Sequence, residues 1–205
     1  MIIGICGFIG SGKDTVADYL VENHNFTRDS FAGTLKDAVS AIFSWDRDLV
    51  EGRTKEARDW REQVDPWWAE RLGMPKLTPR LVLQLWGTDI IRDKFHDDMW
   101  IASLENKLRK SNGNVVITDC RFPNEVRAIK NAGGIVVRVV RGPVPEWYET
   151  LVSMQGQATS GIKANYMKQF NVHASEWEWV GSEFDAVIEN NGTLEELYTK
   201  VKNLV

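Results

Sequence analysis

The sequence predicts an α/β fold with a parallel, five-stranded sheet and helices on both of its faces. Two observations predict it. The chain opens with an apolar run, a glycine-rich loop and a helical apolar stripe, in that order. Further along, short apolar runs alternate with segments whose apolar residues recur at helical spacing. Strands that alternate with helices in this way pair in parallel and are joined by right-handed crossovers.

The individual elements follow from local signals. Strands are expected at residues 2–6, 26–31, 115–117, 135–140 and 186–189. Helical stripes occupy residues 16–21, 34–44, 78–87, 97–111, 123–132 and 193–204. Thr78 with Pro79 is a helix start, and Thr193 with Glu196 forms a capping box. Residues 45–77 are charged and rich in tryptophan, and we expect them to be helical or irregular material above the sheet.

Composition and charge limit the functional classes. The chain has 205 residues, enough for one α/β domain with a sizeable core and an inserted lid. Its net charge of −4 does not indicate a nucleic-acid or acidic-membrane surface. No apolar run approaches transmembrane length and the chain begins directly with a strand, so we expect a cytoplasmic protein without a signal peptide. Cys6 and Cys120 lack the partner ligands of a zinc site and are expected to be reduced thiols.

The loop after the first strand has the spacing Gly-x4-Gly-Lys of a phosphate-binding P-loop. Glycine lets backbone N–H groups approach phosphate oxygens closely, and the N-terminus of the next helix adds partial positive charge. The alternative, a chance glycine-rich turn, is disfavoured because the loop lies between a strand and a helix. Lys13 should reach the β- and γ-phosphates. The predicted nucleotide-binding residues of this loop are Gly7, Gly10, Ser11, Gly12, Lys13, Asp14 and Thr15.

Three residues are candidate magnesium ligands. A P-loop lysine is normally followed by Ser or Thr, whose hydroxyl binds Mg²⁺, but here Asp14 comes first and Thr15 second. A carboxylate at this position can hold magnesium directly or through water, or it can act on the phosphate acceptor. Asp119 follows the strand at 115–117 and resembles the second metal-site carboxylate of P-loop enzymes. That signal is weak by itself because many strands end in aspartate.

Several arginines lie at or near the ends of predicted elements, namely Arg92, Arg121, Arg138 and Arg141. Phosphoryl transfer between two anions needs several cations to neutralise donor, acceptor and transition state. Arg121 lies just past a strand and a carboxylate, which favours a functional role over a solvated surface charge. For Arg92 the two interpretations are equally balanced.

The chain resembles the bacteriophage deoxynucleoside monophosphate kinases. The resemblance covers most of the chain, thins at residues 45–77 and 144–170, and includes the Lys-Asp-Thr variant of the P-loop. It is carried by Ser11-Gly12-Lys13-Asp14-Thr15, Ala32-Gly33 with Lys36-Asp37-Ala38, Gln84 with Gly87-Thr88-Asp89, Trp100, Asp119 with Arg121, Val139-Val140-Arg141, His173 with Glu176, and Asn191-Gly192 with Leu194-Glu195-Glu196-Leu197.

The resemblance implies a P-loop kinase three-layer fold, with 1–205 as a single domain, an acceptor-binding region at about 32–100 and a lid at about 142–180. It implies transfer of the γ-phosphate of ATP to a deoxynucleoside monophosphate (dNMP), with Mg²⁺. The implied catalytic residues are Lys13, Asp14, Arg121 and Arg141. The implied acceptor-binding residues are Lys36, Trp60, Arg92, Trp147 and Glu176, while Asn190 and Gly192 would lie against adenine.

Alternatives to these roles remain open. Trp86 and Trp100 lie on apolar helix faces and favour the hydrophobic core over the substrate. Trp147 could equally be a packed plug, and Glu176 a surface residue. The chain could also be another P-loop small-molecule kinase, such as one acting on a coenzyme precursor, or a nucleotide-dependent switch or binding module. The Asn-Lys-x-Asp motif of GTPases is not found.

The sequence leaves open which bases are accepted and what the oligomeric state is, a homodimer being one arrangement. The expected partners are small nucleotide substrates, with neither nucleic acid nor membrane among them. For a phage-encoded protein the expected location is the cytoplasm of the host cell.

Overall fold

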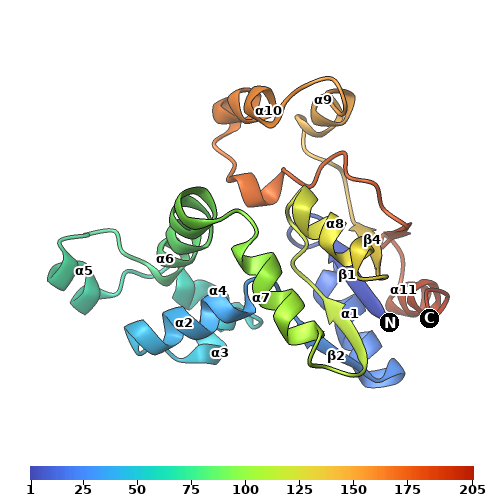
Figure 1. Ribbon diagram of the computed structural model, residues 1–205, viewed down its shortest axis with the longest axis horizontal. Coiled ribbons are helices and arrows are strands. Elements are labelled where there is room, and N and C mark those ends of the chain that lie inside the picture. Colours follow the sequence, from blue (N-terminus) through green and yellow to red (C-terminus); the bar gives the residue numbers. More distant parts are fainter. The chain divides into compact units, whose positions relative to one another are not determined.

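The computed structural model describes all residues, 1–205, and divides into two compact units. The sheet unit consists of residues 1–30 and 111–205, and the helical unit consists of residues 31–110. Figure 1 traces both units in chain order. The helical unit is inserted between the second and third strands, so it occupies much of the region expected from sequence to bind the acceptor.

The sheet unit contains a five-stranded sheet in the order β2-β3-β1-β4-β5. All of its neighbouring strands are parallel, which confirms the predicted architecture. The strands are β1 (Ile2–Cys6), β2 (Phe26–Asp29), β3 (Asn114–Ile117), β4 (Ile135–Val140) and β5 (Ala186–Glu189). The central strand is β1, whose Gly4 pairs with Ile117 of β3 and whose Cys6 pairs with Arg138 of β4.

Helices cover both faces of this sheet. Successive side chains of a strand point to opposite faces. Ile3 and Ile5 belong to a buried cluster with residues of α1 (Lys13–His24) and α11 (Leu194–Lys202). Gly4 faces the other way, where a Cβ would lie 2.3 Å from Ile129 Cδ1 in α8 (Pro123–Asn131). The sheet is therefore the middle of three layers.

The remaining helices of the sheet unit lie between β4 and β5. They are α9 (Tyr148–Ser153), α10 (Ser160–Met167), and the short 3₁₀ turns η2 (Lys168–Phe170) and η3 (Ala174–Glu176). Leu151 of α9 and Met167 of α10 are buried. The segment expected to be a lid thus has regular structure and its own apolar packing.

The helical unit begins with α2 (Gly33–Phe43), and the tryptophan-rich segment after it forms α3 (Arg47–Glu51), α4 (Lys55–Arg61) and α5 (Pro66–Leu72). Each of these three short helices starts at a side chain that accepts hydrogen bonds from backbone N–H groups: Asp46, Thr54 and Asp65 respectively. In this segment Trp45 stacks on Phe43, Trp68 contacts the same ring at a tilt, and Trp60 lies edge-on to Trp45, so the charged segment has an aromatic interior.

The rest of the helical unit consists of α6 (Pro79–Gln84), a π-helix η1 (Leu85–Phe95) and α7 (Met99–Leu108). The helix predicted at 78–87 is present, but it continues into the wider π-helical turns. The indole N–H of Trp100 in α7 donates to the carbonyl oxygen of Gly87 in η1 at 2.7 Å. Trp100 is only 8% exposed, which confirms its assignment to the core. None of the helices combines the length and the apolar character that a membrane crossing requires.

We predict that Trp100→Phe lowers the free energy of unfolding by about 1–3 kcal/mol, because the ring remains apolar but the buried carbonyl of Gly87 loses its donor. Trp67→Phe is the matched control, since Trp67 is exposed on α5. Urea denaturation followed by circular dichroism measures both. Equal losses in the two variants would contradict the role assigned to the Trp100–Gly87 hydrogen bond.

Candidate phosphate-binding site

The loop between β1 and α1 has a backbone that glycine adopts far more readily than other residues. Gly7, Gly10 and Gly12 have positive φ angles of 142°, 78° and 101°. A Cβ on Gly7 would lie 2.4 Å from the carbonyl oxygen of Val139, and one on Gly12 would lie 2.3 Å from Asn190 Nδ2. Both the dihedral angles and the close neighbours therefore require glycine at these two positions.

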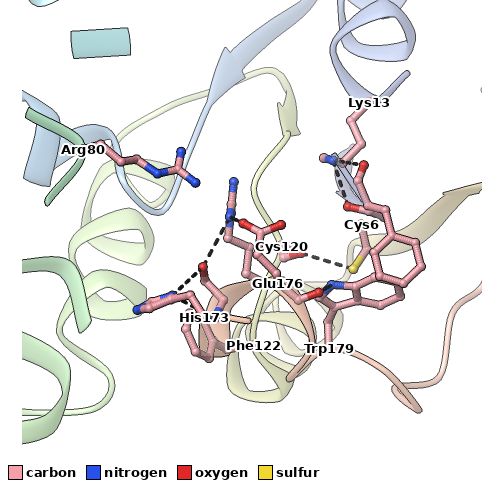
Figure 2. Close-up of polar contacts among 12 residues, drawn as sticks. Cys6, Lys13, Arg80, Cys120, Phe122, His173, Glu176 and Trp179 are labelled. Carbon is pink, nitrogen blue, oxygen red and sulfur yellow. Dashed lines mark hydrogen bonds and ion pairs between the residues drawn. The ribbon is translucent and has the colours of Figure 1, made fainter. Parts of the chain in front are cut away.

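Lys13 folds back over this loop. Its Nζ donates to the carbonyl oxygens of Gly7 and Phe8, each at 2.8 Å (Figure 2). Burial lowers the pKa of Lys13, and the positive charge of Arg121 lowers it further, while the carboxylate of Glu176 acts in the opposite direction. The ammonium group therefore lies in a partly desolvated place close to a second cation.

Two further features of the loop fit a phosphate group. No side chain caps the N-terminus of α1, which leaves its first-turn N–H groups available to an anion. The hydroxyl of Ser11 is buried and has no hydrogen-bond partner. Together with Lys13, these groups provide donors and positive charge along one short stretch of backbone.

Arg121 follows β3 and is held in place by a buried carboxylate. Glu125 is 2% exposed and accepts hydrogen bonds from the backbone N–H groups of Arg121, at 2.8 Å, and Phe122, at 3.1 Å. Glu125 is not among the residues predicted from the sequence. Its position two residues after Pro123, in the first turn of a helix, was the available signal, because acidic residues there commonly accept from free N–H groups.

The guanidinium of Arg121 forms an ion pair with Glu176 of η3. Arg121 Nη1 lies 2.6 Å from Glu176 Oε1, and Ser175 next to it is hydrogen-bonded to His173 Nδ1 at 2.9 Å (Figure 2). Desolvation lowers the pKa of Arg121, but the charges of Glu176 and Asp119 outweigh it and the pKa is raised. The structure thus brings together Lys13, Asp119 with Arg121, and Glu176, which come from three segments that lie far apart in the sequence.

The loop also contacts the segment after β4 through Phe8. Its ring lies edge-on to Trp147, with centroids 5.7 Å apart, and to Trp179, with centroids 4.8 Å apart. Arg138 of β4 lies over the rings of Tyr148 and Trp179 and donates to the Tyr148 hydroxyl. We call Phe8, Trp147, Tyr148 and Trp179 the aromatic cluster. Trp147 is 6% exposed within it, so the packed alternative describes this residue, and its side chain has little surface left for an acceptor.

The predicted magnesium ligands lie in different surroundings. The Asp14 side chain is 69% exposed and forms an ion pair with Arg28 at 3.1 Å. Thr15 is half-buried in the first turn of α1. Asp119 is half-buried beyond β3, and continuing the register of β3 with β1 by two residues brings it level with Cys6, where the loop begins.

No group of three or more His, Cys, Asp or Glu side chains is arranged to hold a metal ion. A magnesium ion carried on nucleotide phosphates needs only one or two protein carboxylates, because phosphate oxygens and water supply its other ligands. The half-buried carboxylate of Asp119 beside the loop fits that requirement better than the exposed, paired carboxylate of Asp14.

The turn after β5 and the end of β4 lie beside the loop. Asn190 Nδ2 donates to the carbonyl oxygen of Ser11 at 2.9 Å. Gly192 packs against the capping carboxylate of Glu196, which a Cβ at this position would strike. Arg141 is exposed beyond the end of β4. The predicted adenine-side residues therefore include one, Asn190, that contacts the phosphate loop directly.

The predicted acceptor residues of the helical unit have protein partners. Lys36 Nζ lies 2.5 Å from Glu51 Oε1, and Arg92 is buried and pairs with Asp97 at 3.5 Å. Arg92 is therefore not the solvated surface charge that was one of its two interpretations. Trp60 lines an open hollow of about 570 Å³ together with Leu49, Lys55, Glu56, Asp59 and Gln63.

A family model and three relatives of known name point to one family. Residues 74–160 match the model of the deoxynucleotide monophosphate kinase family. A protein of Acanthamoeba polyphaga mimivirus, to which deoxynucleotide monophosphate kinase activity is ascribed, is 30% identical over 100% of this chain and 96% of its own. The deoxynucleoside-5'-monophosphate kinase of Escherichia phage T5 is 26% identical over 82% of this chain and 87% of its own. The deoxynucleotide monophosphate kinase of Enterobacteria phage T4 is 24% identical, over 98% and 97%.

We predict that neither cysteine reacts with a thiol reagent in the native protein at pH 8. Burial raises the pKa of Cys6 to about 12 and raises that of Cys120 well above its ordinary value, so both remain protonated thiols, whereas the thiolate is the reactive form. Cys6 Sγ also donates to the carbonyl oxygen of Cys120 at 3.1 Å (Figure 2). Labelling with a chromogenic disulfide should be negligible in buffer and should reach both thiols in denaturant. Rapid labelling of one thiol in buffer would contradict the burial.

Proposed function

The chain belongs to the deoxynucleotide monophosphate kinase family, and we propose that it transfers the γ-phosphoryl group of ATP to a dNMP, giving a dNDP and ADP. The observation that carries the proposal is the convergence of Lys13, Arg121 and Asp119 on a glycine loop whose N–H groups and buried hydroxyl can receive phosphate. In the reaction, a phosphate oxygen of the acceptor attacks the γ-phosphorus, and the bond from that phosphorus to the oxygen of ADP breaks.

Lys13 and the loop would bind the donor. The ammonium of Lys13 donates to two neutral carbonyl oxygens, and replacing either of them with a phosphate oxygen would be a gain in Coulomb energy. Negative charge builds up on the γ-oxygens and on the β–γ bridging oxygen during transfer. A lysine fixed beside those oxygens stabilises the transition state more than it stabilises bound ATP.

Arg121 would act on the transferring group. Its backbone is fixed by Glu125, which sets where the guanidinium can reach, and its charge acts on Lys13. Glu176 pairs with one nitrogen of the guanidinium, Nη1, and its carboxylate has the same sign of charge as a phosphate group. An incoming phosphate would share or replace that ion pair. Arg141, exposed beyond β4, is available as a further cation.

Asp119 would hold magnesium, with Thr15 and Asp14 as the other residues near the phosphate end of α1. A magnesium ion bound to the nucleotide neutralises charge on the phosphates and orients them. The residues of this chain would then have three roles. The loop binds the phosphates, Asp119 positions the ion, and Lys13 and Arg121 stabilise the negative charge that develops during transfer.

The helical unit would bind the acceptor, with Lys36, Trp60 and Arg92 as its contacts. Trp60 lines the open hollow of the unit, and an aromatic face stacks on any base. Residues 142–180 would cover the reacting groups and exclude water. Of the two other functions considered, a kinase for a coenzyme precursor fits the same loop, but the family assignment favours a dNMP as the acceptor.

We predict that the purified protein with ATP and Mg²⁺ phosphorylates at least one dNMP in a steady-state assay against all the common NMPs and dNMPs. Lys13→Ala should cost about 3 kcal/mol or more in kcat/KM, because it removes a charge that contacts the transition state. Phosphorylation of a different acceptor class, with every dNMP inert, would refute the proposal. A folded Lys13→Ala variant with nearly wild-type activity would refute the role of the lysine.

We predict that Asp119→Asn raises the magnesium concentration needed for half-maximal activity by about tenfold or more, in line with the loss of a charged group from a metal site. Asp14→Asn is the matched comparison: it makes the same chemical change at an exposed carboxylate that is paired with Arg28, and it should shift the requirement by less. Titration of activity with Mg²⁺ at saturating ATP measures both. A larger shift for Asp14→Asn would assign the ion to Asp14 instead.

A further inference from the structure

We propose that Asn190 is a positioning residue for the phosphate loop and that its neighbour Asn191 positions the segment around Arg141, so that one turn aligns both parts of the site. The family resemblance implies a contact with adenine for Asn190 instead. The inference rests on the proposed function: for Asn190 in taking the glycine loop as the binding place of the donor's phosphates, and for Asn191 in taking Arg141 as a cation of the transfer.

The first observation is the hydrogen bond from Asn190 to the loop. Its Nδ2 donates to the carbonyl oxygen of Ser11 at 2.9 Å, and since a carbonyl oxygen can only accept, the orientation of the amide follows from its partner. The backbone N–H of Asn190 donates to the carbonyl oxygen of Val140 at 2.7 Å. Asn190 is thus anchored to the sheet through its backbone and to the loop through its side chain.

The second observation is the close approach at Gly12. A Cβ there would lie 2.3 Å from Asn190 Nδ2, so the amide of Asn190 occupies the space beside this peptide. In a trans peptide the C=O and the following N–H lie in one plane and point in opposite directions. Fixing the carbonyl of Ser11 toward Asn190 therefore fixes the N–H of Gly12 away from it. The side chain of Asn190 sets the direction of a loop donor without contacting a ligand itself.

The third observation is that the side chain of Asn191 accepts a hydrogen bond, whereas the side chain of Asn190 donates one. Its Oδ1 accepts from the backbone N–H of Gly142 at 2.8 Å. Gly142 directly follows Arg141 and has a φ of 67°, a left-handed conformation that favours glycine. One amide of the turn therefore donates to the phosphate loop, and the next accepts from the chain at Arg141. The turn limits how far Arg141 can move relative to the loop.

Binding of inorganic tripolyphosphate separates a positioning role from an adenine contact. We expect Asn190→Ala to raise the Kd for ATP and the Kd for tripolyphosphate by the same factor, about fivefold to tenfold, as for loss of one well-formed hydrogen bond. An adenine contact would weaken ATP and leave tripolyphosphate unchanged, and that result would overturn the proposal. Asn23→Ala is the matched control, because Asn23 Nδ2 donates to the carbonyl oxygen of Tyr19 at 3.0 Å, in the last turns of α1. It should change neither Kd in calorimetric titrations.

Aspartate substitutions at the two neighbouring positions test which side chain of the turn donates a hydrogen bond and which accepts one. Asn190→Asp removes a donor and should bind tripolyphosphate at least as weakly as Asn190→Ala. Asn191→Ala should lower kcat by about threefold or more, while the Kd for ATP changes less than about twofold. Asn191→Asp keeps the acceptor for Gly142 and should restore most of the lost kcat. A kcat as low in Asn191→Asp as in Asn191→Ala would overturn the role of Asn191.

Two controls separate the proposed positioning roles from a general loss of stability and from failure of the proposed function. Thermal unfolding of each variant measures any general loss of stability, which would lower all parameters together and would not separate Kd from kcat. The wild-type protein is assayed for dNMP phosphorylation in parallel. Its failure there would count against the proposed function, whereas tripolyphosphate binding needs no catalysis and still decides the role of Asn190.

Discussion

The parallel register of β1 between β3 and β4 is the constraint on which the site depends. The carboxyl ends of all strands meet at one edge of the sheet. This brings together three segments that are distant in the sequence: the loop after β1, Asp119 after β3 and Arg138 in β4. The same register places Gly7 against the carbonyl of Val139, where a side chain would not fit. A slip of one residue would turn every side chain of the strand to the opposite face and separate these groups.

Cations gathered at this edge have to be stabilised before any nucleotide arrives. Lys13 donates to two carbonyl oxygens, Arg121 pairs with Glu176, and Arg138 lies over aromatic rings. Two of these arrangements use neutral partners, which reduce the cost of desolvation but leave the charge uncompensated. Lys13, whose direct partners are neutral, can therefore still gain from an ion pair with the phosphates of a nucleoside triphosphate, while each cation retains a defined position.

Sequence reasoning found what is local and missed what depends on the register. The glycine loop, the parallel sheet and the helix starts at Pro79, Pro123 and Leu194 follow from spacing and capping residues, and the structure confirms these elements. Phe8 was missed because its partners, the rings of the aromatic cluster, are brought to it only by folding. Glu125 is an exception, because its place in the first turn of a helix is a local signal that was not used. The pairing of Asp14 with Arg28 depends on how β2 lies beside α1, which no spacing along the chain indicates.

The P-loop pattern also treats as equivalent four positions that the structure distinguishes. Between Gly7 and Gly12, the side chain of Phe8 joins the aromatic cluster, Ile9 is 70% exposed, and Ser11 is buried with its carbonyl held by Asn190. The loop is therefore attached at both ends to segments outside the motif, one after β4 and one after β5. Since Phe8 contacts Trp147 and Trp179, any movement of the segment between β4 and β5 must either carry the loop with it or break this packing. Asn190 opposes movement of the loop with that segment, because its side chain holds the loop at Ser11 while its backbone is hydrogen-bonded to Val140 of the sheet.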